Sequence, residues 1–237
     1  MPCPYKSKSC YGSFKTMLLI ELDLIEYARC LELQNRIVQR KIFEKGPDVL
    51  LILEHPPTVT LGIRGKSSDL LISQQELAER GVALYHVDRG GEATFHGPGQ
   101  IVCYPIVDLK ALGLSARKYV QGLEETIMKI LEAFDVRGFC RPGKVGVWTS
   151  PVDKIASIGV RIQRRITSHG FSLNVDLKMN PSDLIVSCGM PDARMVSLNQ
   201  LSRRPASVES VRKAVASCFA DVFGVHFEQG SLELVLA

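Results

Sequence analysis

The first part of the chain carries one helical hydrophobic pattern followed by strand-like runs. Apolar side chains recur at helical spacing over residues 25–44, and Gly46-Pro47 ends the pattern, which predicts a helix. Continuous apolar runs at residues 49–53 and 58–61 flank a Pro56-Pro57 corner and predict two strands. The chain therefore begins as a helix followed by buried strands.

The middle of the chain predicts two further helices with strands between them. Ser73 and Glu76 form a capping box that opens a short helix, which Gly81 closes. Ser115 caps a longer helix to residue 134, with a regular apolar stripe. Two strands are predicted between these helices, at residues 83–87 and 101–109.

The last third changes to a strand-rich pattern. Runs at residues 145–149, 155–162 and 166–175 predict strands, and the turn at 163–165 joins the last two as a hairpin. A shorter apolar run at residues 184–186 predicts another strand, and Ser207 caps a final helix to residue 223. We therefore expect an α+β fold, with helices flanking a mixed and mainly antiparallel sheet.

Length and charge narrow the class of protein. The 237 residues fit one domain, which we place at residues 17–237 behind a flexible tail at residues 1–16. The net charge of +4 comes with one short basic run, residues 161–165, which we interpret as a solvated hairpin end. We expect neither nucleic acid nor membrane as partner, because basic stripes and long apolar segments are missing from the sequence. A weakly positive surface suits an acidic protein partner.

The cysteines indicate a reducing compartment. All seven are scattered without a C-x-x-C pair, so we expect no disulfide framework, no metal site and a cytoplasmic location. We also expect a monomer. Four of them lie in apolar runs and are predicted to be buried: Cys30, Cys103, Cys140 and Cys218. Cys188 differs, because it follows an apolar run and stands between Ser187 and Gly189, a setting that favours an accessible thiol but also fits a buried one.

Two other segments carry polar groups that packing does not require. Residues 89–100 contain four glycines and one proline together with Arg89, Thr94 and His96, which favours a ligand-binding loop over a plain connection. Lys154 begins an otherwise apolar strand; taken alone, it is an exposed strand end more often than a functional group. His169 stands in the return strand of the same hairpin, where a hydrogen-bonded structural histidine is the usual finding.

At these segments the chain resembles the octanoyltransferases of protein lipoylation. The matching motifs are RGGEATFHGPGQIVCYPI from residue 89, GVW followed by KIASIGV from 154, TSHGFSLNV from 167, and CGM from 188. They occur in the family's order and spacing, and the resemblance spans residues 18–223. It implies the fold of the biotin and lipoate protein ligase catalytic domain. Two positions depart from the pattern: Ser187 replaces a common proline and Phe95 a frequent tyrosine.

The resemblance also implies site residues and partners. It makes Cys188 and Lys154 a catalytic dyad, with no metal, ATP or other cofactor. The donor it implies is acyl carrier protein, with the acyl group on phosphopantetheine, and the acceptors are lipoyl domains of 2-oxoacid dehydrogenases and the glycine cleavage H protein. The substrate-binding positions carried over are Arg89, Gly90, Gly91, Glu92, Ala93, Thr94, Phe95, His96, Ser157, Ile158, Gly159, Gly170, Phe171 and Ser172.

The chemistry expected of the dyad is thioester exchange followed by amide formation. A free thiol is only about 3% thiolate at neutral pH, and a nearby ammonium raises that fraction. Lys154 either supplies that charge or acts as a neutral base. Backbone N–H groups near Gly170 and Gly189 are candidates for stabilising the oxyanion, and apolar side chains between the strands are expected to line a tunnel for the acyl chain.

Two alternatives stay open at this point. An ATP-dependent lipoate or biotin ligase of the same fold would activate a free acid as an adenylate and would need no cysteine. A non-catalytic protein that only binds acyl carrier protein would need neither Lys154 nor Cys188.

Overall fold

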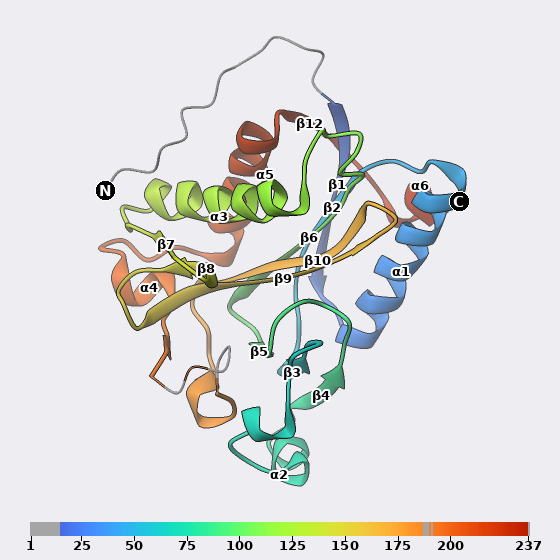
Figure 1. The fold of residues 1–237 in the computed structure, drawn as a ribbon. Coiled ribbons are helices and arrows are strands. Elements are labelled where there is room, and N and C mark those ends of the chain that lie inside the picture. The colour runs from blue at the N-terminus through green and yellow to red at the C-terminus, as the bar shows by residue number, and fades with distance from the viewer. Residues whose placement is uncertain (1–14, 187–189, 191, 237) are drawn as a thin grey trace.

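The structure, a computed structural model, describes residues 15–186, 190 and 192–236. Within these residues a large mixed sheet forms the centre of the molecule, in the strand order β12-β1-β2-β6-β10-β9-β8-β7, with β11 paired to β9 (Figure 1). Its strands are β1 (Lys15–Leu24), β2 (Val49–Glu54), β6 (Gln100–Ile106), β7 (Phe139–Arg141), β8 (Lys144–Trp148), β9 (Asp153–Gln163), β10 (Ile166–Asn174), β11 (Arg194–Met195) and β12 (Val225–Gln229).

The sheet is parallel at one edge and antiparallel through its centre. β1 runs parallel to β2 and β12, whereas β2, β6, β10, β9, β8 and β7 are successively antiparallel. The β9–β10 turn uses Arg164 and Arg165, whose φ values of 47° and 71° suit a tight two-residue hairpin. Both arginines are exposed. The predicted hairpin, its solvated basic end and the mixed α+β sheet are therefore confirmed.

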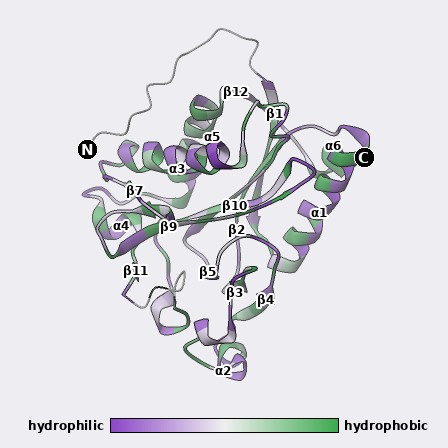
Figure 2. Cartoon of the chain, viewed as in Figure 1, coloured by the Kyte–Doolittle hydropathy of each residue, from purple (hydrophilic) through white to green (hydrophobic). Residues whose placement is uncertain are grey.

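Helices cover both faces of this sheet. α3 (Ala116–Ala133) and α5 (Val208–Phe223) lie on one side, and α1 (Tyr27–Glu44) with α6 (Leu232–Leu236) lies on the other (Figure 1). β2 shows how one strand serves both layers, because Leu50 and Ile52 pack toward α3 and α5 while Leu51 and Leu53 pack toward α1. Hydrophobic and hydrophilic residues alternate along α1 and α3, as expected of helices that bury one face (Figure 2).

A smaller lobe lies below the main sheet in Figure 1. Its three-stranded sheet has the order β4-β3-β5, and its strands are β3 (Thr58–Leu61), β4 (Ala83–His86) and β5 (Ala93–His96). The other short elements of the chain are α2 (Gln74–Glu79), α4 (Leu198–Leu201) and the 3-10 turns η1 (Ser67–Asp69) and η2 (Pro181–Asp183). The Ser73–Glu76 capping box is present at the start of α2, as predicted.

Several sequence expectations need correction. The run at residues 184–186 is not a strand: Leu184 and Ile185 are buried in the core of the small lobe, and Ile185 makes only an isolated bridge to Leu70. Its apolar character reflects packing, which does not require a hydrogen-bonded ladder. The segment 89–100 is not a continuous loop, because it contains β5. β1, which begins at Lys15, β7, β11, β12 and α6 were not predicted; α1, α3 and α5 were.

The cysteine expectation holds only in part. Cys30 and Cys103 are buried, Cys218 is partly exposed and Cys140 is exposed. Cys140 lies on β7, the last strand of the main sheet, so its side chain has a neighbouring strand on one side only. Among the described residues, no helix has both the length and the apolar composition of a membrane span, and no cluster of metal-ligating side chains is found.

Candidate active site

Two adjoining cavities lie where the small lobe meets the main sheet. The outer cavity has a volume of about 230 Å³ and is bounded by the glycine-rich segment, β9, the β7–β8 turn and Met190. The inner cavity, of about 20 Å³, extends it toward β10 and α1. Arg89, Thr94, Ser157 and Gly159 line both cavities, so the two form one continuous site.

Most of the substrate-binding positions carried over from the family motifs meet at these cavities. The outer one is lined by Arg89, Gly90, Gly91, Glu92, Thr94, Ser157, Ile158 and Gly159, and the inner one adds His96, Gly170, Phe171 and Ser172. Ala93 and Phe95 are buried in the core of the small lobe instead. This follows from β5 being a strand, in which successive side chains point to opposite faces.

Arg89 joins the glycine-rich segment to the small sheet. Its Nη2 donates to Thr60 O and Thr60 Oγ1 at 2.8 Å and to Glu92 O at 3.0 Å, and its Nε donates to Thr60 Oγ1 at 3.2 Å. The side chain is buried with its guanidinium directed at backbone and hydroxyl oxygens. It therefore shapes the wall of both cavities as well as lining them.

Gly159 allows the glycine-rich segment to approach β9 closely. A β-carbon at Gly159 would lie 2.7 Å from Gly90 O, closer than real contacts of this kind, and the Gly90 N–H donates to Val160 O at 3.0 Å. Any side chain at position 159 would push the segment away from the strand. The glycine in KIASIGV is thus explained by a backbone-to-backbone contact that closes the site.

Lys154 is buried with only 1% of its surface exposed, so the interpretation as an exposed strand end is wrong. It lies on β9 between β8 and β11, at a point where the β8–β9 register shifts. Its Nζ is 5.4 Å from the centre of the Trp148 ring, within the range of a cation–π contact. A buried lysine is costly and marks candidate functional sites.

The charge of Lys154 contributes to the pKa values of two carboxylates from different parts of the fold, Glu92 and Glu124. Burial alone raises the pKa of Glu92, but the hydrogen bond and charge of Arg64, with a contribution from Lys154, bring that pKa below its usual value. Burial raises the pKa of Glu124 on α3, opposed by the Gly146 N–H at 3.1 Å and by Lys154. Glu92 lines the outer cavity, so Lys154 acts electrostatically on the site.

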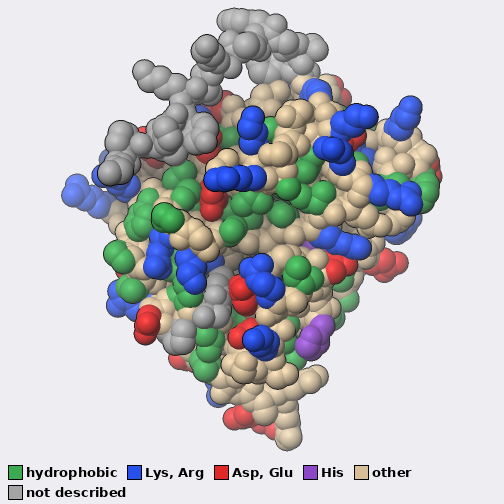
Figure 3. All heavy atoms as spheres, in the orientation of Figure 1, with side chains coloured by type: hydrophobic (Ala, Val, Ile, Leu, Met, Phe, Trp, Pro, Cys, Tyr) green, Lys and Arg blue, Asp and Glu red, His purple; other side chains and the backbone are tan. Residues whose placement is uncertain are grey.

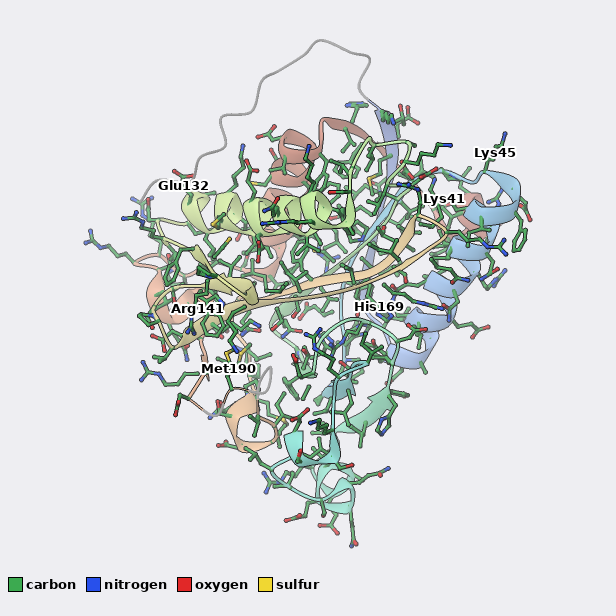
Figure 4. All side chains as sticks on the ribbon, in the orientation of Figure 1. Lys41, Lys45, Glu132, Arg141, His169 and Met190 are labelled. Atoms are coloured by element: carbon green, nitrogen blue, oxygen red, sulfur yellow. The ribbon has the colours of Figure 1, made fainter. Side chains whose placement is uncertain are left out.

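Buried histidines and tyrosines surround the inner cavity. His169 lies near the centre of the molecule, below β10 (Figure 4), and its Nε2 is 3.2 Å from Asp88 Oδ1, as expected of a hydrogen-bonded histidine. His96 Nδ1 is 2.8 Å from Gln100 Oε1. Burial lowers the pKa of His55 to about 4 and also lowers the pKa values of His96 and His169. These imidazoles are therefore neutral at physiological pH.

Sequence reasoning missed several residues of this region. Tyr27 lies within the predicted first helix but was not singled out there, and no signal pointed to Tyr104, Asp88 or Glu124. Tyr27 and Tyr104 line the inner cavity, and Asp88 directly precedes the RGG motif. Glu124 follows the buried Leu123 on α3, and helical periodicity alone places it at the edge of the buried face.

Cys188, with Ser187 and Gly189, lies outside the described residues. The nearest described residue after it is Met190, which lines the outer cavity and is labelled beside Arg141 in Figure 4. Over the face of the molecule seen in Figure 3, Lys and Arg side chains are scattered among Asp, Glu and hydrophobic side chains.

The fold and the sequence both match known proteins. Residues 26–220 match the family model of the lipoyl protein ligase A/B catalytic domain. In structure, the chain resembles the bipartite lipoate protein ligase of Thermoplasma acidophilum, with a TM-score of 0.69 at 15% identity, covering 94% of this chain and 90% of the other. It also resembles lipoate-protein ligase A bound with ATP, with a TM-score of 0.69 at 13% identity and coverages of 94% and 92%.

Curated relatives are closer in sequence. The octanoyltransferase of Acidobacterium capsulatum is 42% identical over 87% of this chain and 89% of its own length. That of Gloeobacter violaceus is 41% identical, with coverages of 93% and 96%. The mitochondrial octanoyltransferase LIP2 of Arabidopsis thaliana is 38% identical, with coverages of 88% and 89%.

The chain therefore has the lipoate protein ligase fold and belongs to the lipoyl protein ligase A/B catalytic domain family. Within that family it is a member of the octanoyltransferases, and it is an acyltransferase.

Proposed function

We propose that this chain transfers an octanoyl or lipoyl group from acyl carrier protein to a specific lysine of lipoyl domains, through a thioester on Cys188. This would be the first step of endogenous protein lipoylation. The observation that carries the proposal is Lys154, a lysine buried to 1% exposure that acts electrostatically on a cavity-lining carboxylate. The octanoyltransferase relatives support octanoyl as the acyl group.

The first half-reaction exchanges one thioester for another. The Cys188 thiolate attacks the carbonyl carbon of the acyl-phosphopantetheine thioester, and the leaving pantetheine thiolate takes up a proton from the Lys154 ammonium, which becomes neutral. Because a thioester is broken and another is formed, the free-energy change is small and no ATP is required. The Lys154 ammonium favours the thiolate form of the nucleophile.

The second half-reaction forms the amide. The acceptor lysine amine attacks the Cys188 thioester, Cys188 leaves as thiolate, and the amine proton passes to Lys154 in its neutral form. The product amide is more stable than the thioester, which drives the cycle forward. Lipoyl domains of 2-oxoacid dehydrogenases and the glycine cleavage H protein are the proposed acceptors. In support, one solved relative is described together with an E2 lipoyl domain.

Intact-protein mass spectrometry tests the covalent step. We expect wild-type protein mixed with octanoyl-loaded acyl carrier protein to gain one octanoyl group, and the Cys188→Ala variant to gain none. An adduct that persists in Cys188→Ala would exclude this cysteine as the carrier. The absence of any adduct or transfer with wild type would favour a protein that only binds the carrier.

A second assay separates acyl transfer from ligation. Apo lipoyl domain is supplied either with octanoyl carrier protein, or with free octanoate, ATP and Mg²⁺. We expect acylated lipoyl domain only in the first reaction. Product in the second reaction would instead show the ATP-dependent ligase activity that the fold also supports in other proteins.

A further inference from the structure

The inner cavity contains two buried polar atoms without hydrogen-bond partners among the described residues. These are Tyr27 Oη and His169 Nδ1, on two side chains that line the cavity from α1 and β10. Both side chains are 1% exposed. Buried polar atoms are nearly always paired, so two unpaired atoms on residues that line one small cavity call for a partner that the described chain does not provide.

His169 is held in this position at a conformational cost. Its φ of 55° is unfavourable for a residue with a side chain, and its backbone N–H donates to Gln34 Oε1 at 2.8 Å. Strained backbone of this kind is typical of functional sites, because it persists only where the surroundings enforce it. The strain directs the imidazole between Asp88 and the inner cavity.

The protonation states of these groups define the missing partner. Burial raises the pKa of Tyr27, so its hydroxyl keeps the proton and can donate it. The Asp88 carboxylate accepts a hydrogen bond from the His169 Nε2–H group. The other ring nitrogen, Nδ1, is therefore an acceptor. His96 donates through Nδ1 to Gln100 Oε1, and its Nε2 is likewise an acceptor. The partner must therefore accept one hydrogen bond and donate one or two, as water and alcohols do.

The size of the cavity agrees with this chemistry. A volume of about 20 Å³ exceeds the ~10–15 Å³ that one buried water needs. We propose that the inner cavity binds one water molecule, which a terminal hydroxyl can replace, and that this water closes the inner end of the acyl-binding cavity. The acyl part of this inference rests on the proposed octanoyl transfer.

The water discriminates among acyl chains by their length and by their terminal group. An acyl chain that ends beside the residues lining both cavities leaves the water in the inner cavity. A longer chain with a methyl end must expel the water, which leaves Tyr27 Oη and His169 Nδ1 unpaired, and is therefore disfavoured. A chain of the same length that ends in a hydroxyl replaces the water and keeps both hydrogen bonds.

A crystal structure of the ligand-free protein tests the water site independently of catalysis. We expect an ordered water within about 2.6–3.2 Å of both Tyr27 Oη and His169 Nδ1, and its loss in Tyr27→Phe. An empty cavity, or protein groups bonded to both atoms, would overturn the proposal. Tyr85→Phe is the matched control, because the Tyr85 ring stacks on Tyr27 at 5.3 Å but does not line the inner cavity.

Transfer assays with acyl-pantetheine thioesters test the selection. Each thioester with a methyl end, from hexanoyl to dodecanoyl, is paired with one in which a hydroxyl replaces the terminal methyl. For the longer pairs we expect wild type and Tyr85→Phe to favour the hydroxyl by roughly tenfold in kcat/KM, and Tyr27→Phe to lose that preference. The same preference in all three proteins would refute the selection, whereas no transfer even from octanoyl carrier protein would refute the proposed function instead.

Discussion

The side chain of Lys154 lies directly on the backbone of Gly146. A β-carbon at Gly146 would come within 2.7 Å of Lys154 Cε and 3.1 Å of its Nζ, and within 2.6 Å of Ala156 O. The φ of Gly146 is +119°, and its N–H donates to Glu124 Oε1 at 3.1 Å. The glycine of the GVW motif therefore makes room for the buried lysine and connects it to α3.

Replacing Gly146 with alanine should displace Lys154. The new methyl group overlaps the lysine stem and the backbone of β9. From the proposed role of Lys154 we expect the transfer rate to fall by roughly 100-fold, the loss that displacement of a reacting group can produce. Octanoyl transfer to a lipoyl domain under single-turnover conditions measures this effect.

Gly113→Ala is the control for that variant. Gly113 also has a positive φ, +68°, but a β-carbon there would meet no atom within 4 Å. Backbone strain should lower the unfolding free energy of both variants by about 1–2 kcal/mol, and the overlap with β9 should lower that of Gly146→Ala further. Only Gly146→Ala should lose activity. Equal activity losses in the two would show that strain, and not the contact with Lys154, is responsible.

Glu124→Gln should move the pH profile of the proposed Cys188 acylation toward lower pH. An anion near an acid opposes loss of its proton, and the substitution removes that anion. The glutamine keeps an oxygen for the Gly146 N–H but removes the charge. We expect both limbs of the profile to shift down by roughly half a pH unit to one unit.

Glu125→Gln provides the comparison for this shift. Glu125 is the next residue on α3, and the same chemical change there should leave the profile in place. Superimposable profiles for Glu124→Gln and wild type would show that Glu124 supports β8 without influencing the proposed dyad.

The folded protein should lose stability as the pH falls below neutral. His55 is 0% exposed, and burial lowers its pKa from the usual value of 6.5 to about 4 in the folded protein. The unfolded chain therefore takes up this proton first, and the stabilisation present above about pH 6.5 is lost as the pH falls toward about 4. His96 and His169, whose pKa values are also lowered, act in the same direction.

Urea unfolding at about pH 7 and about pH 5 measures this dependence. His55 alone should account for about 2 kcal/mol of the loss. His55→Gln should reduce the pH dependence by that amount. Parallel pH dependences in wild type and His55→Gln would contradict the assignment.

Arg89→Lys should loosen the small lobe although the charge is kept. Lysine cannot reproduce the forked contacts that Arg89 makes with Thr60 and Glu92 O, so buried acceptors lose their partners. We expect a loss of about 2–3 kcal/mol in unfolding free energy by urea titration. Arg80→Lys, at an exposed position, should change it by less than about 0.5 kcal/mol. Equal unfolding free energies in the two variants would show that the contacts of Arg89 do not stabilise the small lobe.

The sequence alone determined the elements with strong periodicity or clear local signals. α3 and α5 have regular apolar stripes and serine caps, and the β9–β10 hairpin follows from two apolar runs around a short polar turn. These signals act between residues close in the chain, so local pattern is sufficient to predict them. The motifs from Arg89, Lys154 and Thr167 likewise identified the segments that meet at the two cavities.

Only the tertiary structure decided what each side chain of those segments touches. β5 is a strand because β3 lies beside it, and that pairing directs Thr94 to the cavities and Phe95 to the small-lobe core. Lys154 resembled an exposed strand end until β8 and β11 were found on either side of it. Burial, unpaired hydrogen-bonding atoms and charge neighbours such as Glu124 depend on contacts between residues distant in sequence, which no local pattern contains.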